Sequence, residues 1–164
     1  MAAARYPALR LSPRVYNAEE RAVIRRAVRL LDRGLREPRR KAFSNPMLAA
    51  TYLRSWIGQS DVEVFAGLFL DNHHRLLAAE ELFRGTIAQT AVYPREVVRA
   101  AMRHNAAALI VAHNHPSGVP EPSVADRQLT RVLRDALALV DVRLLDHLIV
   151  ADEGVWSFAD HGLI

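Results

Sequence analysis

The sequence predicts an α/β fold in which a mixed β-sheet is sandwiched between helices. Segments with apolar residues at helical spacing alternate with short runs of β-favouring residues, which is the pattern of this class. Proline and glycine punctuate the boundaries between these segments. Hydrophobic residues make up 51% of the 164 residues, enough for a conventional core. We expect a basic N-terminal helix and linker over residues 1–43 and one compact domain over residues 44–164.

The N-terminal arm is strongly basic. Residues 1–41 carry twelve arginines or lysines against four acidic residues, a net charge of +8, whereas the rest of the chain carries −4. This charge fits contact with nucleic acid or with an acidic partner. It fits equally a solvated helix face in an arginine-favouring genome, since the chain has 21 arginines and one lysine. Residues 17–41 contain no aromatic stacking platform between the arginines, which favours the solvated face.

The first helix is expected over residues 17–36. Asn17 and Glu20 have the spacing of a capping box, and Gly34 and Pro38 mark the end. An apolar stripe along it would pack on its own domain or on a second copy of the chain, as in a homodimer, and we favour its own domain. The stripe consists of Val23, Ile24, Ala27, Val28, Leu31 and Leu35.

A second helix is predicted from Ser44-Asn45-Pro46 to Gly58, because proline is favoured at the first helical position after a capping side chain. Trp56 would anchor it in the core. From Asp61 the pattern changes to alternating strands and helices. We expect strands at 62–70, 75–83, 85–93, 106–112, 142–150 and 155–158, and helices at 94–105 and 123–140.

Two histidines stand at the end of the expected strand 106–112. Residues i and i+2 of an extended segment project to the same side, so His113 and His115 converge on one point. Asp126, in the first turn of the helix that opens at Ser123, would reach the same point. Two imidazoles and a carboxylate match a catalytic zinc site, in which a fourth position activates water. Ser-x-x-Asp is also a helix-capping signature, so both interpretations stay open on the residues alone.

These residues carry a resemblance to a known family. His113-Asn114-His115-Pro116, followed by Ser123 and Asp126, reproduces the His-x-His-Pro-x(6)-Ser-x-x-Asp pattern of the JAMM (MPN+) metalloproteases. With Pro94-Arg95-Glu96 before it and Leu145-Asp146-His147 after it, the longer string resembles the RadC family. The resemblance implies a JAMM/MPN-type fold related to the cytidine deaminase-like fold. It also implies a zinc-dependent hydrolase that cleaves an amide or isopeptide bond of a protein or peptide.

The resemblance also implies roles for single residues. Glu63, at the start of an apolar strand, would be the general base, with Glu80 and Glu81 as alternatives. The Ser123 hydroxyl would help to stabilise the tetrahedral intermediate. The ligands of one zinc ion (Zn2+) per chain would be His113, His115 and Asp126.

Other functions stay in consideration. Full-length RadC proteins carry an upstream helix-hairpin-helix region, whose glycine hairpins residues 1–43 lack, so a DNA-associated role gains little from this chain. A non-catalytic interaction module is one alternative. A His-Asn-His nuclease is another, although its histidines are normally spread over a ββα unit. A cytidine deaminase is disfavoured, because the chain has no cysteine to bind zinc.

Composition also bounds the compartment. The absence of cysteine excludes a disulfide framework and fits a reducing environment. No apolar run approaches the 18 residues of a transmembrane helix, and the first residues lack the apolar region of a secretory signal. We therefore expect a cytoplasmic protein without a membrane partner.

Overall fold

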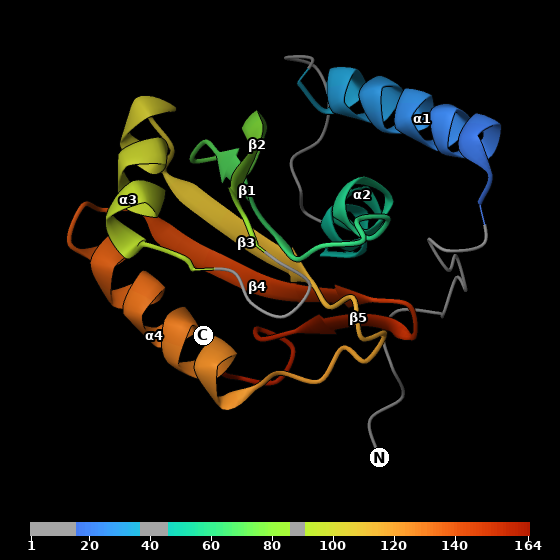
Figure 1. The fold of residues 1–164 in the computed structure, drawn as a ribbon. Helices are drawn as coiled ribbons and strands as arrows, with labels where there is room; N and C mark the ends of the chain where they lie inside the picture. Colours follow the sequence, from blue (N-terminus) through green and yellow to red (C-terminus); the bar gives the residue numbers. More distant parts are fainter. Residues whose placement is uncertain (1–15, 37–45, 86–90) are drawn as a thin grey trace.

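The computed structural model describes residues 16–36, 46–85 and 91–164, which form a mixed sheet flanked by helices (Figure 1). The predicted α/β class is confirmed. The elements are α1 (Ala18–Arg36), α2 (Pro46–Ile57), β1 (Val64–Leu70), β2 (Leu76–Arg84), α3 (Pro94–Arg103), β3 (Ala108–Asn114), α4 (Val124–Ala138), β4 (Arg143–Ala151) and β5 (Gly154–Ser157).

The sheet has five strands in the order β2-β1-β3-β4-β5. Strands β3 and β4 are parallel, and the other neighbouring pairs are antiparallel. Because a parallel pair needs a long crossover, helix α4 lies between β3 and β4 in the chain. Strand β3 occupies the centre of the sheet, so its end lies next to β1 on one side and β4 on the other.

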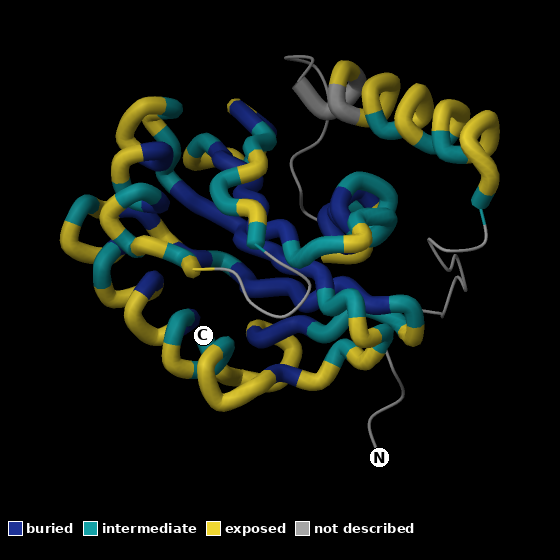
Figure 2. Tube along the Cα trace, viewed as in Figure 1, coloured by how far each residue is buried: buried dark blue, intermediate teal, exposed yellow. Residues whose placement is uncertain are grey.

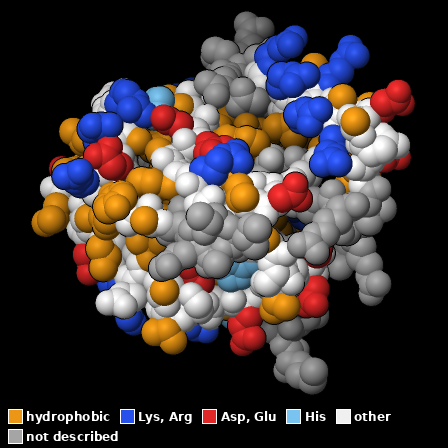
Figure 3. Space-filling model, in the orientation of Figure 1, with side chains coloured by type: hydrophobic (Ala, Val, Ile, Leu, Met, Phe, Trp, Pro, Cys, Tyr) orange, Lys and Arg blue, Asp and Glu red, His pale blue; other side chains and the backbone are white. Residues whose placement is uncertain are grey.

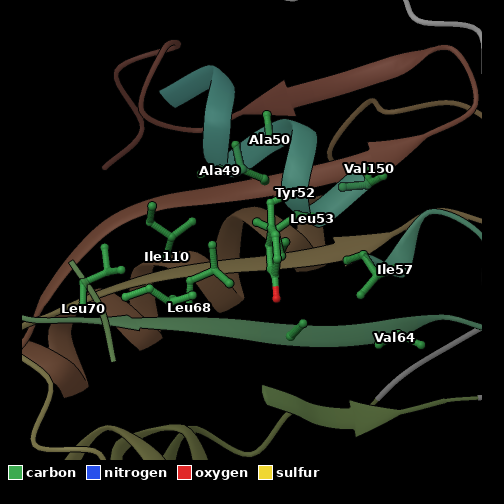
Figure 4. Packing of buried hydrophobic residues seen from close by; sticks show 14 of the residues in the cluster. Ala49, Ala50, Tyr52, Leu53, Ile57, Val64, Leu68, Leu70, Ile110 and Val150 are labelled. Atoms are coloured by element: carbon green, nitrogen blue, oxygen red, sulfur yellow. The ribbon is translucent and has the colours of Figure 1, made fainter. Parts of the chain in front are cut away.

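Helices cover both faces of the sheet (Figures 1 and 2). Alternate residues of β1 and β3 join two different hydrophobic clusters. On β1, Leu68 and Leu70 join the cluster under α2, and Figure 4 shows them below Leu53 of that helix. Phe65 and Phe69 join the cluster under α3 and α4. Burial on both faces explains why β1 is apolar throughout instead of alternating with polar residues.

Two details differ from the sequence prediction. The strand expected over residues 85–93 falls mainly on residues 86–90, outside the described residues, and its described flanks have no strand structure. The apolar residues at helical spacing in 123–140 predict that Val132 faces inward, but in α4 it is 46% exposed, and the polar Thr130 is buried instead. Thr130 has a polar partner in the interior, which a count of apolar residues at helical spacing does not detect.

Helix α1 begins as expected. The Asn17 side chain accepts hydrogen bonds from the backbone of Glu19 and Glu20, and the Glu20 carboxylate accepts one from the Asn17 N–H at 2.8 Å. The predicted inward face is only partly correct, however. Val28 packs against the cluster under α2, but Val23 is 67% exposed. The helix lies on the outside of α2, so only a narrow line of its surface is covered (Figure 2).

Arginine side chains gather along the exposed side of α1 (Figure 3). Most of the remaining basic arm lies in residues 1–15 and 37–41, outside the described residues. Nucleic-acid contact, a homodimer and the division of the chain at residue 43 therefore stay predictions. Within the described ranges, no helix is both long enough and apolar enough to cross a membrane.

Candidate metal centre

The end of β3 separates three consecutive polar side chains by face, as the extended backbone requires. His113 faces α4, and its backbone continues the β3 pairing with Phe65 of β1. Asn114 faces the opposite side. Its amide oxygen accepts a hydrogen bond from the Val64 N–H at 2.7 Å. Its amide nitrogen donates to the carbonyls of Ser60 and Val62, at 3.2 and 3.1 Å.

A turn after His115 carries the chain to α4. Gly118 takes the left-handed conformation (φ 92°) that this turn needs, and its N–H donates to the His115 carbonyl. Ser123 then caps α4 through a reciprocal capping box with Asp126. Oxygen Oδ2 of Asp126 accepts from the Ser123 N–H at 2.8 Å and from the Ser123 hydroxyl at 2.6 Å.

The structure shows that Asp126 serves the cap and faces the histidines at the same time. The Nε2 atoms of His113 and His115 are 2.9 Å apart. Asp126 Oδ1 lies 3.3 Å from Nε2 of His113, and Asp126 Oδ2 lies 3.7 Å from Nε2 of His115. Ligands bound to zinc at about 2.0–2.1 Å with tetrahedral angles lie roughly 3.3 Å apart. The three side chains therefore form a group with the spacing and donor types of a metal site.

Hydrogen bonding prepares His115 for this arrangement. Its Nδ1 lies 2.9 Å from the Val119 carbonyl, which only accepts, so Nδ1 carries the proton and Nε2 presents a lone pair to the group. The nearby Asp126 carboxylate raises the pKa of His115 despite partial burial, and the charge of Glu63 adds to this effect. Burial alone would raise the pKa of Asp126, but its interactions with His113 and His115 hold it well below its usual range.

Glu63 immediately precedes β1, and the Gly85 N–H donates to its carbonyl at 2.9 Å. Its charge contributes to the raised pKa of His115. The alternative glutamates have partners elsewhere. Glu80 pairs with Arg103 at 2.7 Å and also with His104. Glu81 pairs with Arg84 at 2.7 Å. The assignment of Glu63 as the base stays a prediction.

Two residues that sequence reasoning did not place in the site lie directly behind it. His147 of β4 is fully buried, and its Nε2 lies 2.8 Å from Nδ1 of His113. Its Nδ1 lies 2.7 Å from the hydroxyl oxygen of Thr130 on α4. Burial lowers the pKa of His147 well below its ordinary value and so favours the neutral ring. The available signal was polar residues within otherwise apolar segments, since buried polar groups need partners.

A mixed sheet covered by helices on both faces, with a His/His/Asp group at the end of its central strand, defines an α/β domain of the JAB (MPN) class. The chain belongs to the RadC-like JAB domain family, whose model matches residues 43–163. The resemblance stated from the motifs is thereby confirmed.

Several bacterial proteins are similar to this chain at high identity. The chain is 60% identical to a UPF0758 protein of Leptothrix cholodnii over 125 residues, which cover 76% of the chain and 56% of that protein. It is 59% identical to a UPF0758 protein of Halorhodospira halophila over 121 residues, covering 74% and 54%. A UPF0758 protein of Chromobacterium violaceum is 50% identical over 162 residues, covering 98% and 72%. The chain thus spans about half the length of the first two relatives.

Proposed function

We propose that this domain is a metal-dependent hydrolase that cleaves an amide or isopeptide bond in a protein or peptide substrate. The observation that carries the proposal is the convergence of the two Nε2 atoms, 2.9 Å apart, with the Asp126 carboxylate. Uncharged imidazoles that direct lone pairs at one point repel each other unless a cation or proton lies between them. His113, His115 and Asp126 would hold one zinc ion, which suits two nitrogen ligands and one oxygen ligand.

A bound zinc ion would supply Lewis-acid polarisation of a carbonyl group and activation of water. Glu63 would accept a proton from the attacking water and deliver it to the leaving amine. The Ser123 hydroxyl now donates to Asp126, and it would turn toward the developing oxyanion to stabilise it.

The test combines metal content with hydrolysis for three variants. We expect the purified wild-type protein to hold one zinc ion per chain by native mass spectrometry, His113→Ala to hold none, and Glu63→Gln to keep it. Hydrolysis would be followed with a pool of internally quenched peptides that includes lysine isopeptide bonds. Wild type should cleave members of the pool, and Glu63→Gln should not. Glu121→Gln, at an exposed position, is the matched control.

Each failure points to a different error. Wild-type protein without metal, or His113→Ala protein that retains it, would overturn the metal site. Cleavage by Glu63→Gln would remove Glu63 from the role of base. Metal-dependent cutting of plasmid DNA that His115→Ala abolishes would assign a nuclease instead. The geometry speaks against that outcome, because both histidines come from one strand end and not from a ββα unit.

A further inference from the structure

His147 is a buried residue whose two ring nitrogens both lie within hydrogen-bond distance of a polar side chain. Its ring is enclosed by Phe158, which stacks on it with ring centres 4.8 Å apart, and by the edge of Phe65 at 5.7 Å. Both ring nitrogens have a polar partner, which are His113 and Thr130. A neutral imidazole has one N–H donor and one acceptor nitrogen, so these partners decide which nitrogen carries the proton.

Thr130 determines which atom donates and which accepts in each of these hydrogen bonds. Its hydroxyl lies 2.7 Å from the backbone carbonyl of Asp126, which only accepts, so the single hydroxyl hydrogen points there. Toward His147 the same oxygen must then accept, which puts the proton on Nδ1 of His147. Nε2 of His147 is left with a lone pair. It accepts from Nδ1 of His113, and the Nε2 atom of His113 is therefore unprotonated.

We infer that Thr130 and His147 are positioning residues that hold His113 in the tautomer with its proton on Nδ1, so that Nε2 faces the metal site as a lone pair. This inference rests on the proposed metal centre. The Val119 carbonyl fixes the tautomer of His115 in the same way, so each imidazole has its own hydrogen-bond partner for this purpose. The hydrogen bonds that fix His113 begin at the backbone carbonyl of Asp126. They therefore couple the tautomer of His113 to the position of Asp126, the proposed ligand on the helix.

The consequence of losing the Thr130 hydroxyl follows from the same logic. Without an acceptor at Nδ1, a neutral His147 gains by moving its proton to Nε2, where His113 Nδ1 accepts it. His113 would then carry its own proton on Nε2, and that proton would have to leave before metal binds. Mutation of groups that orient a metal ligand typically weakens metal affinity by about 10–100-fold.

The experiment compares Thr130→Val, which keeps the shape and removes the hydroxyl, with Thr130→Ser, which keeps the hydroxyl. Nitrogen-15 NMR of the imidazoles in chelator-treated protein, at about pH 8 where unperturbed histidines are neutral, reports the tautomers directly. We expect His113 and His147 to carry the proton on Nδ1 in wild type and in Thr130→Ser, and to shift toward Nε2 in Thr130→Val. Zinc affinity, measured by competition with a chelating dye, should fall about 10–100-fold in Thr130→Val only.

The outcomes separate this inference from the proposed function. A wild-type His113 without a proton on Nδ1 overturns the inference without any variant, even if a variant fails to fold. Thr130→Val protein with wild-type tautomers and wild-type zinc affinity also overturns it, and leaves the metal centre standing. Wild-type protein that binds no zinc refutes the proposed function. The tautomer measurement still decides whether Thr130 and His147 fix the proton of His113 on Nδ1.

Discussion

Replacing Asn114 with alanine should destabilise the protein through a loss that can be estimated from its three contacts. The side chain is buried and accepts from the Val64 N–H, which is buried as well. Removing the acceptor of a buried N–H costs about 1–3 kcal/mol, and each of the two hydrogen bonds to the Ser60 and Val62 carbonyls contributes about 0.5–1.5 kcal/mol. We therefore expect a loss of roughly 2–6 kcal/mol in the free energy of unfolding.

The assay is thermal unfolding followed by circular dichroism. For a domain of this size, 1 kcal/mol corresponds to roughly 2–4 °C, so the melting temperature should fall by roughly 4–24 °C. Asn114→Asp keeps the acceptor but directs a carboxylate oxygen at two carbonyls, and it should be destabilised at least as much near neutral pH. Asn72→Ala, at an exposed turn, is the control. A melting temperature for Asn114→Ala within about 1 °C of that control would refute the assignment of these hydrogen bonds.

Two further predictions concern the ion pair and the core. The pKa of Asp126 lies below its ordinary 3.8, so its stabilising contribution is present above that pH and is lost as the pH falls through the lower folded value. The pKa of His115 lies above its ordinary 6.5, so its contribution is present below that pH and is lost as the pH rises through the folded value. In chelator-treated protein, the difference in unfolding free energy between wild type and Asp126→Asn should thus be largest between pH 3.8 and 6.5. Urea unfolding measures this difference. A difference that stays constant across this range and above pH 6.5 would contradict the pairing of Asp126 with His115. Leu133→Ala, which empties a fully buried position, should cost about 2–5 kcal/mol in the same measurement. Leu139→Ala, 86% exposed, should change it by less than about 0.5 kcal/mol, and equal effects of the two would refute the packing of α4.

Local rules predicted the part of the site that depends on local geometry. The two-residue period of a strand placed His113 and His115 on one side and Asn114 on the other, as the structure shows. The spacing from Ser123 to Asp126 predicted a capping box, and the structure has one. The sequence left open whether Asp126 would cap the helix or face the histidines, because a carboxylate has two oxygens and the motif does not say where each points.

Long-range partners were beyond the reach of these rules. His147 reaches His113 only because β4 pairs in parallel with β3, and Thr130 reaches His147 only because α4 lies across that pair. Neither neighbour can be derived from residue spacing. The apolar stripe of α1 was misjudged for a related reason, since periodicity shows that a face is apolar but not how much partner surface is available. Val23, which is 67% exposed, has little partner surface to pack against.

The order of the elements along the chain has a consequence for folding. The three proposed ligands belong to one strand–turn–helix segment, whereas Val64, next to Glu63, is 50 residues away from its partner Asn114. Closing the longer loop costs roughly 1 kcal/mol more conformational entropy than closing the short one, so the short segment closes first. On this ordering, the proposed metal ligands would come together before Glu63, the proposed base, reaches them. Hydrolytic activity would then appear only when β1 pairs with β3 and the central sheet is complete.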